Sequence, residues 1–315
     1  MTHRKYTKKD LREAFFYVES QPVYLHNNGY YQKLSSHNAI VDVQKGRVFA
    51  VVTKDYELVT NEEAYLRAGQ IVNEVFATVN LEELECFNII MPRSRSFCHI
   101  DLVKKDLSFS PFKDDQWWLF LRITNSYNKT KLLRYDLGFC RAICMNGVIF
   151  GAKSVEFVSA HTRGQVSRIT CSDNLEEIRL IEKMLTQKLH NLKRFYVPET
   201  AMWGVFCKTF DLRVTGNESK KRKEALIEIS RKANRLITEY CKDMGPHGYA
   251  ALNVLSDYAT EPAGLISSAN QINNFQRRCG DWIDEFVDSI QKPDFTFEEY
   301  LGEYREYADN LQNLR

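Results

Sequence analysis

The 315-residue chain lacks the motifs that would assign it to a familiar class of enzyme. It contains neither GxGxxG nor GxxxxGK[ST], so no dinucleotide or nucleoside triphosphate loop of the usual kind is predicted. It also contains no CxxC pair, and structural zinc sites commonly take their four ligands from such closely spaced pairs. We therefore predict no cofactor and no metal from its motifs.

Long apolar runs and a strong net charge are also missing. No stretch approaches the roughly 20 apolar residues needed to cross a bilayer, and the basic start MTHRKYTKKD lacks the apolar segment of a signal peptide. We expect no membrane contact and a cytoplasmic location, which would be the host cytoplasm if a phage encodes the chain. The net charge of +2 gives no global argument for nucleic acid.

Eight cysteines are present, and in a cytoplasmic protein of this length we expect buried, reduced thiols rather than disulfides. Two alternatives stay open. Cys98-His99 and Cys140-x3-Cys144 have the tightest spacing for a metal, but on a strand Cys140 and Cys144 would lie about 13 Å apart. Cys144 and His161 suggest a nucleophile and base, but apolar neighbours would raise the pKa of the thiol. No catalytic residue and no metal ligand is assigned.

The N-terminal two thirds shows the short apolar alternation of strands, interrupted by one helix. Arg47–Thr53 and Tyr56–Val59 are predicted to form a hairpin, and an amphipathic helix follows from the cap residues Thr60 and Asn61. Further strands are expected at Glu85–Met91, Phe97–Val103, Trp117–Thr124, Leu132–Cys144 and Val155–His161.

Two details of these strands are also predicted. Alternation of Cys98, Ile100 and Leu102 with His99 and Asp101 is typical of a half-buried antiparallel strand. Asn146-Gly147 is typical of a two-residue hairpin turn, because both residues tolerate positive φ.

From about residue 173 the apolar spacing becomes helical. We expect an α+β protein, with a mainly antiparallel sheet and one packed helix in the N-terminal two thirds and a helical C-terminal region. The predicted domains are residues 1–172 and 173–315. Helices are expected at 173–192, 199–210, 220–244, 249–260, 267–290 and 297–314.

Four segments carry short polar motifs in a fixed order. They are Val52–Tyr65 (VTKDYELVTNEEAY), Leu119–Thr130 (LFLRITNSYNKT), Phe139–Gly147 (FCRAICMNG), and Trp203 with Asn253–Tyr258 (NVLSDY). They resemble Y-x-x-x-x-N-x-E-A-[FY], L-x-x-x-N-S-H-D-G-[ST], [VI]-R-x-V-C-x-N-[GT] and W…N-A-x-[TS]-[ED]-Y in a phage- and plasmid-borne family known only as a domain of unknown function. The resemblance implies a mobile-element origin and supplies no reaction.

The resemblance also points to particular polar positions. Asn125, Ser126 and Arg141 match recurrent polar positions of the family and are candidates for a shared binding face. The alternative is a turn-forming Asn-Ser pair and a solvated strand arginine. The family's His-Asp-Gly is Tyr127-Asn128-Lys129 here, so any metal or phosphate site at that tripeptide would be lost.

Charge is distributed unevenly along the helical region. Residues 213–235 hold eight basic and three acidic side chains, a net charge of +5, and residues 281–315 hold ten acidic and three basic ones, a net charge of −7. The two segments are either solvated helix faces that pair with each other or separate binding surfaces. The candidate binding residues are Lys220, Lys221, Arg222, Lys223 and Arg231 in the first segment and Trp282, Phe286, Tyr300 and Tyr304 in the second.

Two functions follow as hypotheses, and neither requires catalysis. A counter-defence protein would bind a host complex, such as a defence nuclease, through the acidic aromatic tail. A single-strand binding or annealing factor would use the basic segment for phosphates and its tyrosines and phenylalanines for stacking. Self-association, with formation of a homo-oligomer, is expected under both hypotheses because the helical tail is rich in aromatic residues.

Overall fold

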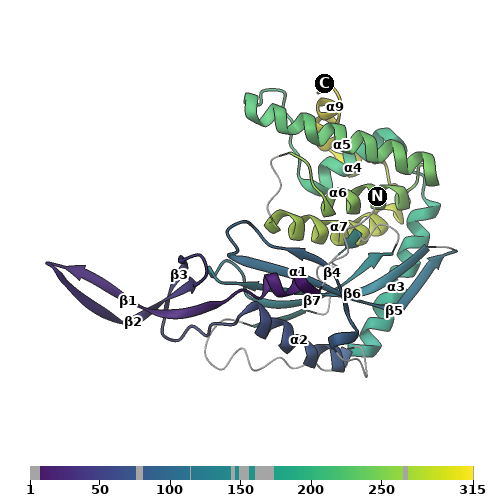
Figure 1. Cartoon of the computed structure of the whole chain (residues 1–315). Coiled ribbons are helices and arrows are strands. Elements are labelled where there is room, and N and C mark those ends of the chain that lie inside the picture. Colours follow the sequence, from purple (N-terminus) through teal and green to yellow (C-terminus); the bar gives the residue numbers. More distant parts are fainter. Residues whose placement is uncertain are drawn as a thin grey trace. The chain divides into compact units, whose positions relative to one another are not determined.

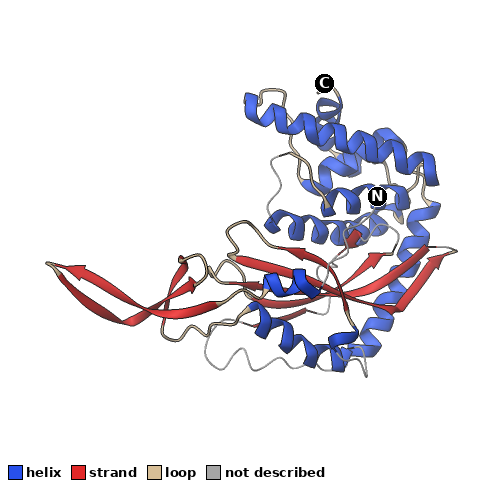
Figure 2. Ribbon diagram, viewed as in Figure 1, coloured by secondary structure: helices blue, strands red, loops and turns tan. Residues whose placement is uncertain are grey.

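The computed structural model shows an α+β protein with antiparallel sheets in the N-terminal two thirds and a helical C-terminal region (Figures 1 and 2). It describes residues 8–75, 81–113, 115–142, 146–148, 156–159, 174–264 and 269–314. Unit 1 comprises residues 1–107, 118–137 and 155–178, and unit 2 comprises residues 108–117, 138–154 and 179–315. The boundary expected at residue 172 follows the change from strands to helices, whereas the compact units alternate along the chain.

Unit 1 contains a three-stranded antiparallel sheet in the order β1-β2-β3 (Figure 1). Its strands are β1 (Val18–Asn27), β2 (Tyr30–Asp42) and β3 (Arg47–Thr53). The strand at β3 was expected, but it pairs with β2, and Tyr56–Val59 forms no strand. Tyr56 and Leu58 instead pack against the apolar cluster beneath the sheet.

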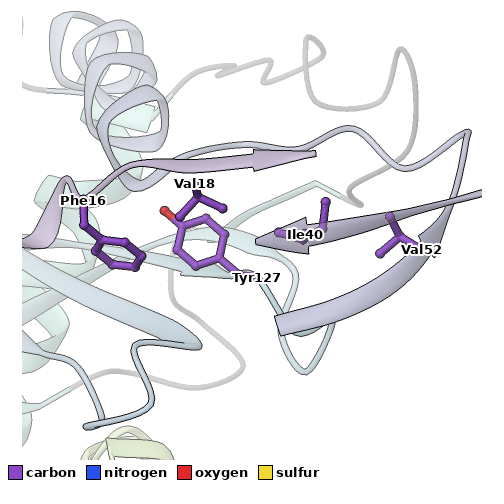
Figure 3. Packing of buried hydrophobic residues seen from close by; sticks show 5 residues of the cluster. All are labelled: Phe16, Val18, Ile40, Val52 and Tyr127. Atoms are coloured by element: carbon purple, nitrogen blue, oxygen red, sulfur yellow. The ribbon is translucent and has the colours of Figure 1, made fainter. Parts of the chain in front are cut away.

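That cluster consists of five buried residues from distant parts of unit 1: Phe16, Val18, Ile40, Val52 and Tyr127 (Figure 3). The Tyr127 ring stacks on Phe49 at 5.3 Å between centroids and meets the edge of Phe16 at 5.5 Å. Tyr127, the first residue of the Tyr127-Asn128-Lys129 tripeptide, is therefore part of the core that holds the base of the β1-β2-β3 sheet.

Two helices complete the described N-terminal part of unit 1, α1 (Lys8–Ala14) and α2 (Asn61–Val75). The helix at α2 was predicted, and it begins with a reciprocal cap. The Glu63 carboxylate accepts from the Thr60 backbone N–H at 2.7 Å, and the Glu63 N–H donates to the Thr60 hydroxyl at 3.1 Å. These two bonds fix the position at which the chain enters α2.

A second sheet has the order β4-β5-β6-β7-β8, with β9 also paired to β7. A 3-10 turn at Leu81–Glu83 precedes it. Its strands are β4 (Glu85–Ile90), β5 (Phe97–Phe112), β6 (Asp115–Ser126), β7 (Leu133–Arg141), β8 (Asn146–Val148) and β9 (Glu156–Ser159). Each expected strand is present, and β5 is longer than predicted.

Two predictions about this sheet are wrong. Asn146 and Gly147 form no turn, because they lie in β8 opposite Arg141 and Cys140. The start of β5 is buried on both faces and not on one. His99 and Asp101 tolerate burial because they have polar partners on neighbouring strands.

The helical region comprises α3 (Asn174–Arg194), α4 (Glu199–Phe210), α5 (Lys220–Met244), α6 (Gly248–Thr260), α7 (Ala269–Ile290), α8 (Phe297–Leu301) and α9 (Tyr304–Gln312). The helix predicted at 297–314 is two helices, because Gly302 takes a φ of +52° between them. Among the described residues, no helix has both the length and the apolar composition to cross a membrane.

Gly204 of α4 lies directly against Leu301 at the end of α8. A Cβ atom added at Gly204 would be 2.5 Å from a Leu301 Cδ atom. The hydrogen side chain therefore permits this close approach of the two helices.

Candidate functional site

The first two motifs meet in unit 1 through side-chain amides. The Asn125 amide nitrogen donates to the Val59 carbonyl at 2.9 Å and to the Asn61 side-chain oxygen at 3.0 Å. The Asn61 amide nitrogen in turn donates to the Ala14 carbonyl at 2.9 Å. Asn125 is 1% exposed, so this series of bonds ties β6 to the start of α2 and lies away from solvent.

Ser126 and Tyr127 extend the same interior network. The Ser126 hydroxyl donates to the Lys131 carbonyl at 2.8 Å and accepts from the Lys131 N–H at 3.1 Å, which closes the turn after β6. The Tyr127 hydroxyl accepts from the Asn61 backbone N–H at 2.8 Å. Asn125 and Ser126 are both buried. Of their two predicted roles, the turn-forming pair therefore fits the structure better than the binding face.

The last two motifs meet in unit 2 around Arg141. Its Nε donates to Asp115 Oδ1 at 2.6 Å, and a terminal guanidinium nitrogen donates to the Asn253 side-chain oxygen at 2.8 Å. The Arg141 side chain is only 12% exposed. It is therefore not a solvated strand arginine but the link that joins β7, β6 and α6.

Tyr249 completes the group around Arg141. Its hydroxyl donates to the second Asp115 oxygen and accepts from the Trp117 indole at 3.2 Å. Burial, the largest cause, raises the pKa of Tyr249 well above its usual value of 10.0. A phenol that stays protonated can donate to Asp115 but is a poor base, so this group stabilises the fold better than it would transfer protons.

Sequence reasoning missed a polar network on one face of the second sheet, across β4, β5 and β6. Arg122 makes two bonds of 2.6 Å to the two Asp101 oxygens, and Asn88 donates to Asp101 at 3.0 Å. His99 bonds the Thr124 hydroxyl at 2.7 Å. The alternation in β5 and β6 was the available signal, because it places these polar side chains on one face of adjacent strands.

The structure places the candidate cations at the first turn of α5. We call Lys220–Lys223 the basic turn, and all four side chains are exposed. Arg222 donates to the Arg213 carbonyl at 2.8 Å, and Lys220, Lys221 and Lys223 have no acidic partner among the described residues. This turn has no acidic residue, so its charges oppose the positive end of the helix dipole. Arg231, two turns further along α5, is exposed as well.

The predicted aromatic docking residues need a correction. Trp282 is 2% exposed and Phe286 is 0% exposed, because their rings stack on each other and Phe286 also packs on the rings of Phe195, Phe295 and Tyr300. Neither side chain can contact a partner in this arrangement. They form a core of unit 2, which is the ordinary role of the apolar face of an amphipathic helix.

Tyr300 and Tyr304 are less buried than these two. The Lys208 ammonium lies 3.7 Å from the Tyr300 ring centroid. The Tyr304 hydroxyl donates to Asp211 at 2.6 Å, and this bond, followed by the one from Arg213, lowers the pKa of the Asp211 carboxyl. Tyr304 lines a pocket of about 370 Å³ together with Lys208, Thr209, Asp211, Arg213, Arg278, Asp281, Trp282 and Glu285. Cations and carboxylates alternate there, so the pocket favours neither sign of ligand.

The basic and acidic segments touch, since the Asn310 amide donates to the Val214 carbonyl at 2.8 Å, but no ion pair joins them among the described residues. Ion pairs of the acidic tail run to Lys188 and Lys208, which lie on α3 and α4. No described ion pair joins residues 281–314 to the basic turn.

The described cysteines are free thiols, and five of them are buried. Burial raises the pKa of Cys207 to about 12 and that of Cys86 to about 12, which suppresses the thiolate. No cluster of three metal-binding side chains occurs within the described residues. Cys144, Cys171 and His161 lie outside those residues.

A comparison with known families gives a match over most of the chain. A family model described as "Domain of unknown function (DUF932)" matches residues 48–278, which include all four motifs. None of the curated proteins and none of the solved structures matches the chain. The expectation of a domain-of-unknown-function family is thereby confirmed, and the chain belongs to the DUF932 family.

Proposed function

We propose that the chain acts by binding another macromolecule, and that it blocks a host defence nuclease complex by occupying its DNA-binding surface. The proposal takes the gene to come from a phage or another mobile element, as the motif resemblance implies. The observation that carries it is a set of exposed carboxylates without a cationic partner in the described part of the chain: Asp288, Asp294, Glu299, Glu306 and Asp309.

The physical argument concerns charge complementarity. A surface that binds DNA is positive, and carboxylates held on short, packed helices can occupy the positions of phosphates. The aromatic rings beneath α7 and α8 keep these helices in place, so little side-chain and backbone freedom is lost on binding. Such an interface forms quickly at low salt and weakens as salt is added.

The test is phage plating on hosts that each carry one nuclease-based defence operon. We expect the chain to restore plating on at least one such host, and a variant with Asp288→Asn, Glu299→Gln, Glu306→Gln and Asp309→Asn to fail. The matched control is Lys220→Ala, Lys221→Ala and Lys223→Ala, which alters exposed charges of the other sign. Rescue on no host, or equal rescue by the acidic variant, would rule the proposal out.

A second candidate function is single-stranded nucleic acid binding. It is favoured by the basic turn, because its cations lie in an electrostatically unfavourable place and its three lysines lack carboxylate partners among the described residues. Fluorescence anisotropy of a labelled oligonucleotide at low salt would detect binding. Replacement of the basic turn by alanine should weaken it and flatten the salt dependence by about 0.7 for each phosphate that the variant no longer neutralises. Silence at low salt would exclude this function.

A further inference from the structure

A hairpin of unit 1 projects beyond the rest of that unit (Figure 1). We call residues 23–36 the arm. β3 pairs with β2 only from His37 to Asp42, so the arm is a two-stranded ribbon. Two-stranded ribbons are at best marginally stable in water unless another surface packs against them.

The arm ends in exposed apolar side chains. Tyr30 is 80% exposed and Tyr31 is 76% exposed, while Tyr24 and Leu25 are each about half exposed. Asn28 and Gly29 form the turn with φ values of +46° and +86°, which fixes the register of the strands on either side. The register places Tyr24 and Tyr31 on one face of the ribbon and Leu25 and Tyr30 on the other. Large apolar side chains on both faces of one tip indicate a docking surface, because single exposed ones are ordinary but grouped ones are not.

The base of the same sheet carries a complementary feature. A groove of about 450 Å³ lies on the face opposite the cluster of Figure 3. Ala39 and Val41 are its buried floor, and partly exposed valines such as Val48 and Val51 form its sides. No charged residue lines the groove, whose other residues are Gln21, Pro22, Val23, Val43 and Gly46.

We propose that two copies of the chain dock through these features, with the arm tip of each copy in the apolar groove of the other. A two-fold interface requires one surface that carries both halves of the contact, and this sheet carries an aromatic tip and an apolar groove. The interface goes beyond the function proposed above and does not depend on it.

The lack of charge in the arm favours a second copy of the chain as its partner, over nucleic acid or an anionic membrane. Lys33 is the only charged residue between Pro22 and Val41, so the arm offers almost nothing to phosphates or to an anionic membrane. β1 is an edge strand, and beyond Glu19 it has no charged residue that would protect the edge from pairing. Pro22 and the register shift beside it limit pairing at the base of β1, but the neutral, apolar outer half of the strand is suited to an identical edge.

The test is the mass of the full chain in solution, measured by light scattering after gel filtration over a range of concentrations. We expect the wild-type chain to form a dimer or a larger even-numbered oligomer. Tyr30→Ser with Tyr31→Ser removes the tip, and Val48→Lys places a charge in the groove. Each should raise the dissociation constant of the dimer at least about 30-fold, as loss of an interface hot spot does.

Leu66→Ser is the matched control, because Leu66 of α2 is 62% exposed and outside the sheet; its mass should equal that of the wild-type chain. Circular dichroism melting shows whether each variant is folded. A mixture of the tip and groove variants retains one intact contact, so heterodimers should appear at high concentration.

Two results would overturn the proposal. One is a monomeric wild-type chain at every concentration. The other is an unchanged mass for the folded tip variant. Flotation with neutral phosphatidylcholine vesicles tests whether the tip instead binds a neutral membrane. Co-flotation of the wild-type chain but not of the tip variant would assign the tip to a membrane.

Discussion

The polar residues of the motifs and the cations of the basic turn differ in burial and in interaction partners. The Asn125 amide nitrogen and the Arg141 guanidinium donate to buried partners, whereas Lys220 and Lys221 are exposed, without acidic partners among the described residues, and repelled by the end of their own helix. Buried polar groups need partners if the chain is to fold. The difference indicates that the motif residues hold the fold; under the proposed function, recognition would fall to exposed residues that folding does not require.

The largest expected effect tests the buried side of this comparison. Asp101→Asn leaves the Arg122 guanidinium buried without its counter-charge, and the free energy of unfolding should fall by about 3–5 kcal/mol. Urea denaturation measures it. Glu85→Gln is the control, since the Glu85–Lys105 pair joins the neighbouring strands at the surface and should cost at most about 1 kcal/mol. Equal losses of unfolding free energy from the two changes would contradict the distinction between buried and exposed charges.

A smaller effect is expected at the junction of the first two motifs. Asn125→Ala removes the donor to the Val59 carbonyl and to Asn61, so two buried acceptors lose a partner. The free energy of unfolding should fall by about 1–3 kcal/mol, as chemical denaturation would show. A neutral substitution here would mean that Asn125 is retained for binding.

The pH dependence of stability tests a single buried group. Burial raises the pKa of Cys207 from 9.0 to about 12, so the folded state favours the neutral thiol. This contribution is complete below pH 9 and is lost as the pH rises toward 12. At pH 10 the loss should be about 1 kcal/mol. Denaturation of the wild-type chain and of Cys207→Ala at pH 8 and pH 10 gives the difference in slope, which should be absent if the thiol ionises freely.

The smallest expected effect has the opposite sign. Lys221→Glu in the basic turn places a carboxylate near the positive end of the α5 dipole and should raise the free energy of unfolding by about 0.3–1 kcal/mol. Lys242→Glu in the last turn of the same helix should lower it by a similar amount. Thermal melting of both variants sharpens the comparison, because a stabilised variant that loses binding would show that the turn serves recognition.

Helix boundaries were the most predictable part of the fold. Caps and apolar spacing predict α4 and α5 at the bounds that the structure shows. The strands were found, but their partners were not, because alternation identifies a face of a strand and not its neighbour. The arm was missed, since the packed residues beneath its base come from four distant segments.

The candidate site was less predictable. Arg141 and Asn125 were identified from the motifs, but only the fold shows that their partners include Asp115 and Asn61. Interleaved acids and aromatics in the tail fit both a docking surface and an amphipathic helix, and burial of Trp282 and Phe286 decides for the helix. Charge counts located the basic turn correctly because exposed cations need no tertiary partner.

The contact between Gly204 and Leu301 has a consequence for relatives of this chain. Even an alanine methyl group at position 204 would require the Leu301 side chain to shift, so we expect the two positions to vary together. Among DUF932 sequences that extend this far, we expect a larger residue at the first position to be accompanied by a smaller one at the second. Such paired substitutions would identify the relatives in which α8 packs against α4 at the same place.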